Sequence, residues 1–269
     1  MLQAAETKNE SLVDEVAIVT GASSGIGAAT ARELGQRGAR VVLAARRVDA
    51  LERQAQAIRG AGGEALVVGT DVADPAQVTL LLDRAVATFG RVDVLVNNAG
   101  AAWVRPLAES PVDEVIGLLE VNLLGAILLT RAVLPGMLER HHGTIISVGS
   151  LSGRVAMEPL YSATKYGLRG FSLALRRQVA GSGVSVSLVS PGNIRTAMTR
   201  HVKARLPQPD LVATTIADLV TRPRREVVIP GRNYAIAWLE QVLPSMADIA
   251  YRRRHWSPVE AEGGATWKS

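Results

Sequence analysis

Cysteine is absent from this chain of 269 residues, which rules out disulfide bonds, a thiolate nucleophile and zinc held by cysteine. The four histidines show neither the H-x-x-x-H nor the H-E-x-x-H spacing, so we expect no metal site. Aromatic residues make up only 4% of the chain and hydrophobic residues 48%, which predicts a largely aliphatic core. These shortages leave the oxygen and nitrogen groups of other side chains to carry any chemistry.

Long hydrophobic runs are missing as well. No segment reaches the ~18 consecutive apolar residues of a membrane-spanning helix. Residues 1–14 are polar and contain no apolar signal segment. We therefore expect a soluble, cytoplasmic protein.

The net charge of +5 raises the question of an anionic partner, either nucleic acid or a membrane surface. Most arginines are scattered along expected helices, and the cluster at residues 222–225 contains no aromatic side chain for base stacking. We expect no nucleic-acid partner. The apolar stretch Tyr234–Ala250 followed by Arg252–Arg254 leaves peripheral membrane contact open, although packing on the core or on a subunit partner is the more ordinary explanation.

Short apolar runs alternate with long amphipathic segments along the chain. The runs are apolar at consecutive positions, as in strands covered on both faces. The expected strands are Val16–Thr20, Arg40–Ala45, Ala65–Gly69, Val92–Asn97, Gly143–Val148, Val184–Ser190 and Glu226–Ile229. The expected helices are Ile26–Arg37, Val48–Gly60, Pro75–Phe89, Ser110–Glu139 and Leu160–Ala180. This order predicts an α/β protein with a single doubly wound, Rossmann-type domain: a seven-stranded, mostly parallel sheet with helices on both faces.

Three segments fall outside the regular alternation. We expect residues 1–13 to form an N-terminal tail and residues 231–269 a C-terminal extension. Residues 191–225 contain four prolines, and we expect them to form a substrate lid. Apolar residues in this segment recur at intervals typical of one short amphipathic helix, whose apolar side would close over the cleft. They are Met198, Val202, Leu206, Leu211 and Val212.

A glycine-rich turn follows the first expected strand directly. Gly21, Gly25 and Gly27 lie between this strand and a helix, where glycines let the backbone approach a pyrophosphate and the helix N-terminus supplies N–H groups. The spacing differs from the G-x-G-x-x-G pattern of dinucleotide-binding proteins, so a tight turn without a ligand remains an alternative.

The end of the second expected strand indicates which dinucleotide would bind. An acidic residue there binds the ribose 2′-hydroxyl of NAD(H), whereas a nearby arginine accommodates the 2′-phosphate of NADP(H). This chain has Ala45 at that place, followed by Arg46 and Arg47. We therefore expect NADP(H) as the cofactor.

Two side chains in a later helix suggest acid–base chemistry. Tyr161 and Lys165 are four residues apart, so they lie on one helix face. The lysine ammonium group and an oxidised nicotinamide would both stabilise a phenolate and lower the pKa of Tyr161. Tyr161 then becomes a candidate general acid or base for the interconversion of an alcohol and a carbonyl.

Six motifs in order resemble those of the short-chain dehydrogenase/reductase family, over roughly residues 14–200. They are TGASSGIG (Thr20–Gly27), Asp71-Val72, NNAG (Asn97–Gly100), VNLLG around Asn122, YSATK (Tyr161–Lys165) and PGNIRT (Pro191–Thr196). The resemblance implies a catalytic group of Asn122, Ser150, Tyr161 and Lys165. Ser150 is only eleven residues before Tyr161, which implies a shortened loop at Ala156–Leu160 and leaves Ser152 as a possible substitute.

The resemblance also implies a set of cofactor-binding residues and a homodimer or homotetramer. The set is Gly21, Ser23, Ser24, Gly25, Ile26, Gly27, Arg46, Arg47, Asp71, Val72, Asn98, Ala99, Gly100, Tyr161, Lys165, Pro191, Gly192, Ile194 and Thr196. The expected function is NADP(H)-dependent interconversion of a secondary alcohol and a ketone. A sensor or scaffold protein that binds NADP(H) without turnover is the alternative, although both Tyr161 and Lys165 are present.

The expected substrate is a small, apolar molecule. Residues 101–107, residues 153–160 and the lid would form the walls around the reacting carbon. These segments offer an apolar lining, which favours a hydrophobic ketone, a secondary alcohol or a lipid-like molecule over a phosphorylated or highly charged sugar. The lining residues would be Trp103, Val104, Val155, Met157 and Met198.

Overall fold

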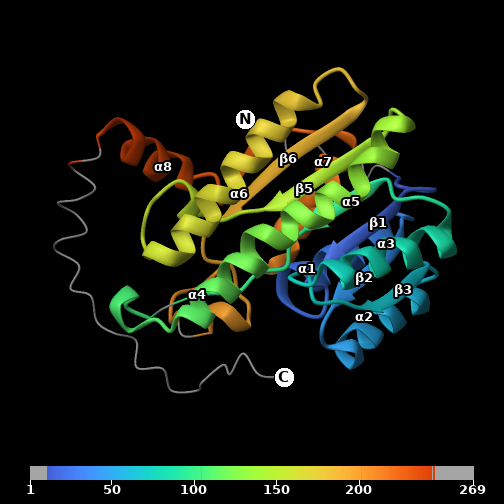
Figure 1. Ribbon diagram of the computed structural model, residues 1–269, viewed down its shortest axis with the longest axis horizontal. Coiled ribbons are helices and arrows are strands. Elements are labelled where there is room, and N and C mark those ends of the chain that lie inside the picture. Colours follow the sequence, from blue (N-terminus) through green and yellow to red (C-terminus); the bar gives the residue numbers. More distant parts are fainter. Residues whose placement is uncertain (1–10, 104, 201, 244, 246–269) are drawn as a thin grey trace, which may run out of the picture.

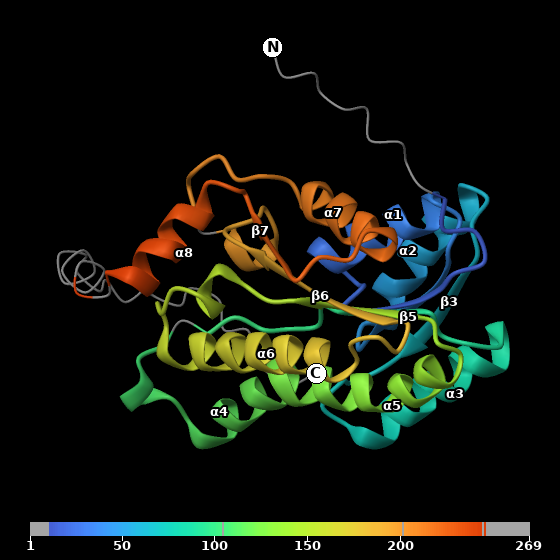
Figure 2. The ribbon, with the colours of Figure 1, turned by 90° about the horizontal axis from the view of Figure 1, so that it is seen from above.

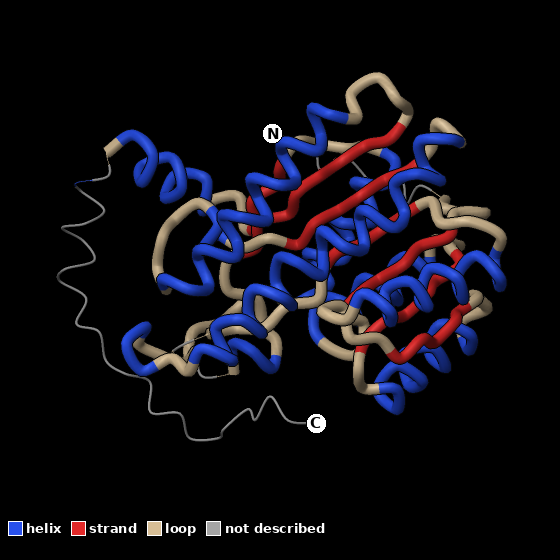
Figure 3. The backbone as a smooth tube through the Cα atoms, viewed as in Figure 1, coloured by secondary structure: helices blue, strands red, loops and turns tan. Residues whose placement is uncertain are grey.

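The computed structural model describes residues 11–103, 105–200, 202–243 and 245. Its seven strands form one sheet in the order β3-β2-β1-β4-β5-β6-β7, and every neighbouring pair is parallel (Figure 1). Figure 3 shows the strands in red and the surrounding helices in blue. The strands are β1 (Val16–Thr20), β2 (Arg40–Ala45), β3 (Ala65–Gly69), β4 (Val94–Asn97), β5 (Gly143–Val148), β6 (Val184–Pro191) and β7 (Glu226–Ile229). The predicted fold class and sheet are confirmed.

Helices cover both faces of this sheet. They are α1 (Gly25–Gln36), α2 (Val48–Gly60), α3 (Pro75–Phe89), α4 (Val112–Leu119), α5 (Gly125–Glu139), α6 (Pro159–Gln178), α7 (Pro209–Thr221) and α8 (Asn233–Val242). Figure 2 shows α1, α2 and α7 on one side of the sheet and α3, α4, α5 and α6 on the other. The chain also forms three short 3-10 turns and one π-helical turn. The 3-10 turns are η1 (Leu107–Glu109), η3 (Leu151–Gly153) and η4 (Ala197–Thr199), and the π-helical turn is η2 (Glu120–Leu124).

The core is divided by the sheet into two apolar layers. In β1, Ala17 and Val19 pack with α1, α2 and α7, whereas Val16 and Ile18 pack with α3 and α5 on the opposite face. Successive side chains of a strand point to opposite faces, so a strand covered on both sides must be apolar throughout. This is why these strands read as continuous apolar runs.

The connections reverse direction between β1 and β4. From β1 the chain runs outward to β2 and β3, and it then returns to place β4 on the other side of β1. The loops after β1 and β4 therefore diverge, which opens a crevice at the carboxyl ends of the strands. This arrangement places the candidate site.

The long helix expected over residues 110–139 is interrupted. It consists of α4, the π-helical turn η2 and α5, and Asn122 is buried within the wide turn. A π turn contains one residue more than an α turn and changes the helix-face periodicity only slightly. The sequence pattern therefore looked like that of one continuous helix.

The expectation of a lid over residues 191–225 is wrong for its second half. Residues 209–221 form α7, whose Val212 and Ile216 side chains are fully buried in the core against α1. The expected helix through Met198 and Val212 does not form either, because the chain makes only the turn η4 before α7 begins at Pro209. Only the stretch before α7 remains a predicted lid.

No helix within the described residues is both long and apolar enough to cross a membrane. The first part of the C-terminal extension forms α8, which leaves Tyr234, Trp238 and Val242 exposed at one end of the molecule (Figure 1). Some predictions fall on parts of the chain that lie outside the described residues. These parts are residues 1–10 of the expected tail, Val104, and most of the C-terminal extension, including Arg252–Arg254.

Candidate active site

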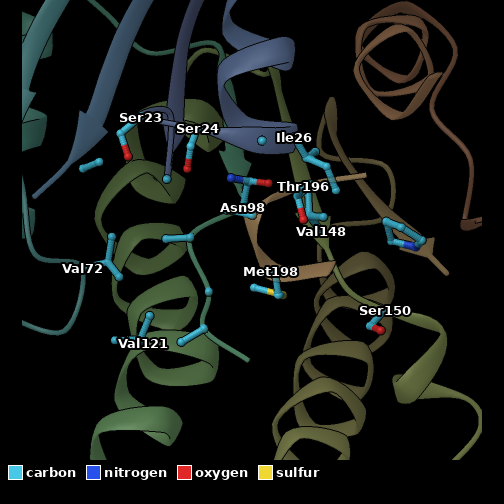
Figure 4. Close-up of a pocket in the computed structure, with 18 of the residues that line it drawn as sticks. Ser23, Ser24, Ile26, Val72, Asn98, Val121, Val148, Ser150, Thr196 and Met198 are labelled. Carbon is cyan, nitrogen blue, oxygen red and sulfur yellow. The ribbon is translucent and has the colours of Figure 1, made fainter. Parts of the chain in front are cut away.

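A cavity of about 460 Å³ occupies the crevice at the carboxyl ends of the strands (Figure 4). Every residue of the predicted cofactor-binding set except Gly27 lines it, and so does Ser150. Ser23 and Ser24 lie toward one end, Ser150 lies toward the other, and Thr196 and Met198 lie between them. The size is within the range of small-molecule sites. Residues from motifs more than 100 positions apart in the sequence thus meet in one place.

The glycine turn that follows β1 is tightly fixed. Gly21 and Gly25 have positive φ angles of 65° and 57°, a conformation that favours glycine. A Cβ atom on Gly27 would collide with the carbonyl oxygen of Gly21 and with the side chain of Asn98. Gly27 therefore lies behind the cavity wall and sets the close packing of the turn instead of lining the cavity.

Thr20, at the end of β1, connects this turn to the loop after β4. Its hydroxyl oxygen accepts hydrogen bonds from the backbone N–H groups of Asn98 and Ala99, each at 3.0 Å. The Asn98 side chain in turn donates to the carbonyl oxygen of Thr20 at 2.8 Å. The sequence signal for this role of Thr20 is a hydroxyl group at the end of an otherwise apolar strand.

Two arginines lie at the end of the cavity near Ser23 and Ser24. Arg47 donates to the hydroxyl oxygens of Ser23 and Ser24 at 3.0 and 2.9 Å. The Arg46 guanidinium is 53% exposed and lies 3.9 Å from the carboxylate of Asp71. Ser24, the residue before α1, caps no N–H group of that helix with its side chain. A helix N-terminus and two exposed guanidinium groups therefore face this part of the cavity, which suits a ligand with several phosphates.

Tyr161 and Lys165 reach the cavity from α6. The ammonium nitrogen of Lys165 donates to the carbonyl oxygen of Val148 at 3.3 Å and lies 5.6 Å from the centre of the Tyr161 ring. Burial lowers the pKa of Lys165 to about 8. The amine therefore loses its proton only slightly above neutral pH, and no carboxylate among the described residues forms an ion pair with it.

The expectation that Lys165 lowers the pKa of Tyr161 is not met in the protein alone. Withdrawal of the phenol from water raises the pKa of Tyr161, and the charge of Glu158 adds to this, while a hydrogen bond with Ser150 opposes it. Desolvation is the largest cause, because a phenolate loses much of its hydration at this position. Tyr161 is therefore held as a neutral phenol, the form that donates a proton.

The cavity contains Ser150 and not Ser152. Ser152 is buried, and its N–H group donates to the hydroxyl oxygen of Ser150 at 3.1 Å. The loop between η3 and α6 is short, as expected, and Met157 is held at its end by a hydrogen bond from its N–H group to the Ser162 hydroxyl at 3.1 Å. The short loop therefore leaves Ser150 beside Tyr161.

Asn122 lies behind the cavity wall and joins two segments. Its side-chain oxygen accepts from the N–H group of Ala101 at 2.7 Å, and its amide donates to the Ala101 carbonyl and to the Thr164 hydroxyl at 2.9 and 3.2 Å. Thr164 then donates to the Tyr161 carbonyl at 2.8 Å. Asn122 thus supports α6 from the π turn through Thr164, a buried hydroxyl within the YSATK motif that the sequence analysis missed.

Of the residues expected to form apolar substrate walls, only Met198 lines this cavity among those the structure describes. Met198 lines the cavity, but Trp103 and Val155 are buried away from it and Met157 is exposed outside it. Trp103 is turned inward because its indole N–H group lies within hydrogen-bond distance of the Arg105 carbonyl and the Ser110 hydroxyl, each at 3.2 Å.

One group among the described residues has the spacing of metal ligands, namely Glu15, Asp93 and His142. It lies before β1 and β4, at the end of the sheet opposite the cavity. Asp93 already accepts hydrogen bonds from Arg91 at 2.9 Å and from the N–H group of Val16 at 3.0 Å. The expectation of no metal site stays a prediction.

Comparison with known proteins decides the family. The family model described as short chain dehydrogenase matches residues 15–207, which include every predicted motif. This chain belongs to the short-chain dehydrogenase/reductase family. The family consists of oxidoreductases that use nicotinamide cofactors, and the phosphate-compatible end of the cavity agrees with a nucleotide of this kind.

Several relatives within the short-chain dehydrogenase/reductase family are ketoreductases by name. The chain is 34% identical to ketoacyl reductase HetN of Nostoc sp. strain PCC 7120, covering 90% of this chain and 89% of the relative. It is 42% identical to 3-oxoacyl-(acyl-carrier-protein) reductase FabG of Escherichia coli strain K12, covering 69% and 76% of the two chains. A solved structure of an actinorhodin polyketide ketoreductase variant with NADPH aligns with a TM-score of 0.76 at 33% identity, covering 81% of this chain and 96% of that one.

Proposed function

We propose that this protein is an NADP(H)-dependent reductase that converts a hydrophobic ketone of the 3-oxoacyl class to a secondary alcohol. The observation that carries the proposal is the meeting of Ser150, Tyr161 and Lys165 with the glycine turn in one cavity. The names of three relatives, all ketoreductases, support the 3-oxoacyl class. Met198, an exposed apolar side chain among those that line the cavity, fits an acyl chain.

Each catalytic side chain has a distinct task in this proposal. The bound nicotinamide supplies the hydride that reduces the carbonyl carbon. The Ser150 hydroxyl donates a hydrogen bond to the carbonyl oxygen, where negative charge develops. Tyr161 donates its phenolic proton to the same oxygen, and its raised pKa keeps that proton in place until it is needed. Lys165, held by the Val148 carbonyl, stabilises the resulting phenolate.

The preference for NADP(H) rests on Arg46 and Arg47. No carboxylate occupies position 45, and both guanidinium groups line the cavity. A guanidinium group binds a phosphate with charge-assisted hydrogen bonds. The NADPH in the related ketoreductase structure supports the same choice.

We also propose that the protein is a homo-oligomer. Exposed apolar side chains follow α4 and the π turn and continue onto α6, although a helix packed on a monomer needs only one buried stripe. They are Val112, Ile116, Leu119, Leu124 and Tyr166. Light scattering at micromolar concentration should give at least a dimer with closed symmetry, and a monomer would contradict the proposal.

The reductase proposal is tested with a panel of ketones and secondary alcohols, including 3-oxoacyl thioesters of increasing chain length. The loss of NADPH absorbance measures turnover, and Tyr161→Phe serves as the inactive control. We expect turnover that improves with acyl chain length. Tight NADPH binding without turnover of any panel member would instead favour the sensor or scaffold alternative.

A further inference from the structure

A buried ionic cluster lies behind the catalytic group, centred on Glu226 at the start of β7. Arg154 binds the two carboxylate oxygens of Glu226 with two hydrogen bonds of 2.7 Å each. Arg169 of α6 approaches the same carboxylate at 3.2 Å, and the Ser190 hydroxyl donates to it at 2.9 Å. The Glu226 side chain is only 5% exposed, and those of Arg154 and Arg169 are 14% and 21% exposed.

The charges of this cluster are held firmly. Burial would raise the pKa of Glu226, but the hydrogen bonds from Arg154 and Ser190 and the charge of Arg169 outweigh it and lower that pKa. The bond with Glu226 likewise raises the pKa of Arg154. Bidentate contacts between arginine and a carboxylate fix orientation as well as distance. The cluster is therefore a rigid junction at neutral pH.

The junction connects the two segments that carry the catalytic side chains. Arg154 directly follows η3, the turn that begins after Ser150. Arg169 follows Tyr161 and Lys165 at further steps of four residues, so all three lie along one face of α6. One carboxylate thus holds the segment after the catalytic serine and the helix of the catalytic tyrosine.

Between Arg154 and Arg169, η3 and α6 pack so closely that there is no room for a side chain between them. A Cβ atom on Gly153 would lie 2.7 Å from the carbonyl oxygen of Lys165, so the backbone of η3 packs directly on α6. A shift of η3 would therefore move Ser150 relative to Tyr161. Only residues 154–158 separate η3 from α6, and so short a loop transmits strain instead of absorbing it.

Tyr234 of α8 closes the outer side of the junction. Its ring stacks with the guanidinium of Arg154 at 5.8 Å, and its hydroxyl donates to the Glu226 carbonyl at 3.0 Å. Four parts of the chain that are distant in sequence therefore converge on Glu226: the segment after Ser150, α6, the end of β6 and the start of α8.

We propose that Glu226 is a positioning residue that sets the Ser150–Tyr161 geometry through Arg154 and Arg169. This inference rests on the proposed reductase function, because it assigns to the cluster the alignment of the serine hydrogen bond with the tyrosine proton donor. Loss of the cluster should slow the chemical step more than it weakens cofactor binding.

The test compares Glu226→Gln and Arg154→Met with a matched control, Arg37→Met. Arg37 is a similarly buried guanidinium, 2% exposed, held between Glu33 and Asp218 at the end of α1 far from the catalytic residues. We expect the cluster variants to lose about ten- to a hundredfold in kcat with the NADPH dissociation constant within about twofold. The control should lower the melting temperature to a similar degree and leave kcat unchanged.

A second measurement reports the geometry without turnover. The Ser150 hydrogen bond opposes the rise in the pKa of Tyr161, so a displaced Ser150 should raise that pKa further. The phenolate absorbance of Tyr161, obtained as the difference between each protein and its Tyr161→Phe counterpart, measures this pKa. A wild-type protein inactive on every ketone would overturn the proposed function, whereas this titration would still test the positioning role.

Arg154→Lys covers the case in which Glu226→Gln does not fold. The lysine keeps a buried positive charge beside Glu226 but cannot form the bidentate hydrogen bonds of Arg154. We therefore expect a kcat between those of the wild type and Arg154→Met. Equal effects of Arg154→Met and Arg37→Met on kcat, or an unchanged Tyr161 pKa in all cluster variants, would show that the cluster only stabilises the fold.

Discussion

The two ends of the cavity are built on different principles. At the end formed by the loops after β1 and β2, the protein offers backbone turns, small side chains and the exposed arginines Arg46 and Arg47. At the end formed by β5 and α6 it offers buried side chains, of which Tyr161 has a raised pKa and Lys165 a lowered one. The first end presents shape and charge, and the second shifts the protonation of buried side chains.

The difference teaches where substitutions are tolerated. An exposed arginine contributes little to stability, because surface charges are well hydrated and screened. A buried lysine or carboxylate is tied to its neighbours, so its replacement changes both stability and chemistry. Substitutions at the first end should therefore change cofactor choice without changing catalysis. Substitutions at the second end should change catalysis and stability without changing cofactor choice.

The largest effect is expected at the catalytic end. Tyr161→Phe removes the proton donor and should lower kcat by about 10²–10⁴-fold, the range for a general acid. NADPH binding, followed by quenching or calorimetry, should change by less than about threefold, because the glycine turn and the arginines remain. If Tyr161→Phe kept more than about a tenth of the wild-type kcat, Tyr161 would not be the proton donor.

The second effect is a pH dependence of stability that arises from Lys165. Its pKa is about 8 in the folded protein and 10.5 ordinarily, so between these values the unfolded chain binds the proton and the folded protein does not. The free energy of unfolding should therefore rise with pH across this window, by roughly 3 kcal/mol in total. Below about pH 8 both states are protonated and the full penalty of burying the charge persists.

Urea unfolding of the wild type and of Lys165→Met, from about pH 7 to 10.5, measures this effect. The difference between the two proteins isolates Lys165, because the titration of Tyr161 is present in both. Parallel stability curves would show that the lysine is better hydrated than its burial indicates.

The third effect belongs to the cofactor end. Replacing Arg46 and Arg47 together with alanine should weaken NADPH binding by about 1.5–3 kcal/mol, or one to two decades, and leave NADH binding nearly unchanged. Arg53→Ala, an exposed arginine on α2 away from the cavity, is the matched control. Equal loss of both cofactors, or a parallel loss of kcat at saturation, would contradict the separation of the two ends.

The smallest effect tests the shape of the glycine turn. Gly27→Ala places a methyl group against the carbonyl of Gly21 and should lower the free energy of unfolding by about 1–3 kcal/mol. Both cofactors should bind more weakly to the same extent. Gly60→Ala, which meets no atom within 4 Å at the end of α2, should be neutral or slightly stabilising. If both variants behaved alike, close packing would not explain Gly27.

The sequence allowed the prediction of features that depend on neighbouring residues. All seven strands were predictable because strands covered on both faces are apolar at consecutive positions. The glycine turn, Ser150 and the Tyr161–Lys165 pair each lie within one short segment, and parallel strands bring the ends of such segments to one edge. Their roles in catalysis and binding remain predictions.

Contacts between residues that are far apart in the sequence could not be predicted. Arg154 and Glu226 are 72 residues apart, and no local pattern marks an arginine that will be buried against a carboxylate. The prolines at 207 and 209 suggested an irregular lid, whereas Pro209 in fact begins α7, as proline readily does at a first helical position. Trp103 and Val155 lie near the site in sequence, but burial in the core draws such apolar side chains away from a water-filled cavity.

The π-helical turn at Glu120–Leu124 also fixes how many residues this part of the chain can contain. A π turn holds one residue more than an α turn, so deleting any one residue there lets the helix relax to regular α geometry. The helices on either side would keep their faces, because the π turn and the α turn that replaces it each complete about one rotation, but Asn122 within the turn would change its direction relative to them. Asn122 would lose register with either Ala101 or Thr164, which it now holds together. A one-residue deletion in this segment should therefore uncouple the loop after β4 from α6, even though it leaves α4 and α5 in place.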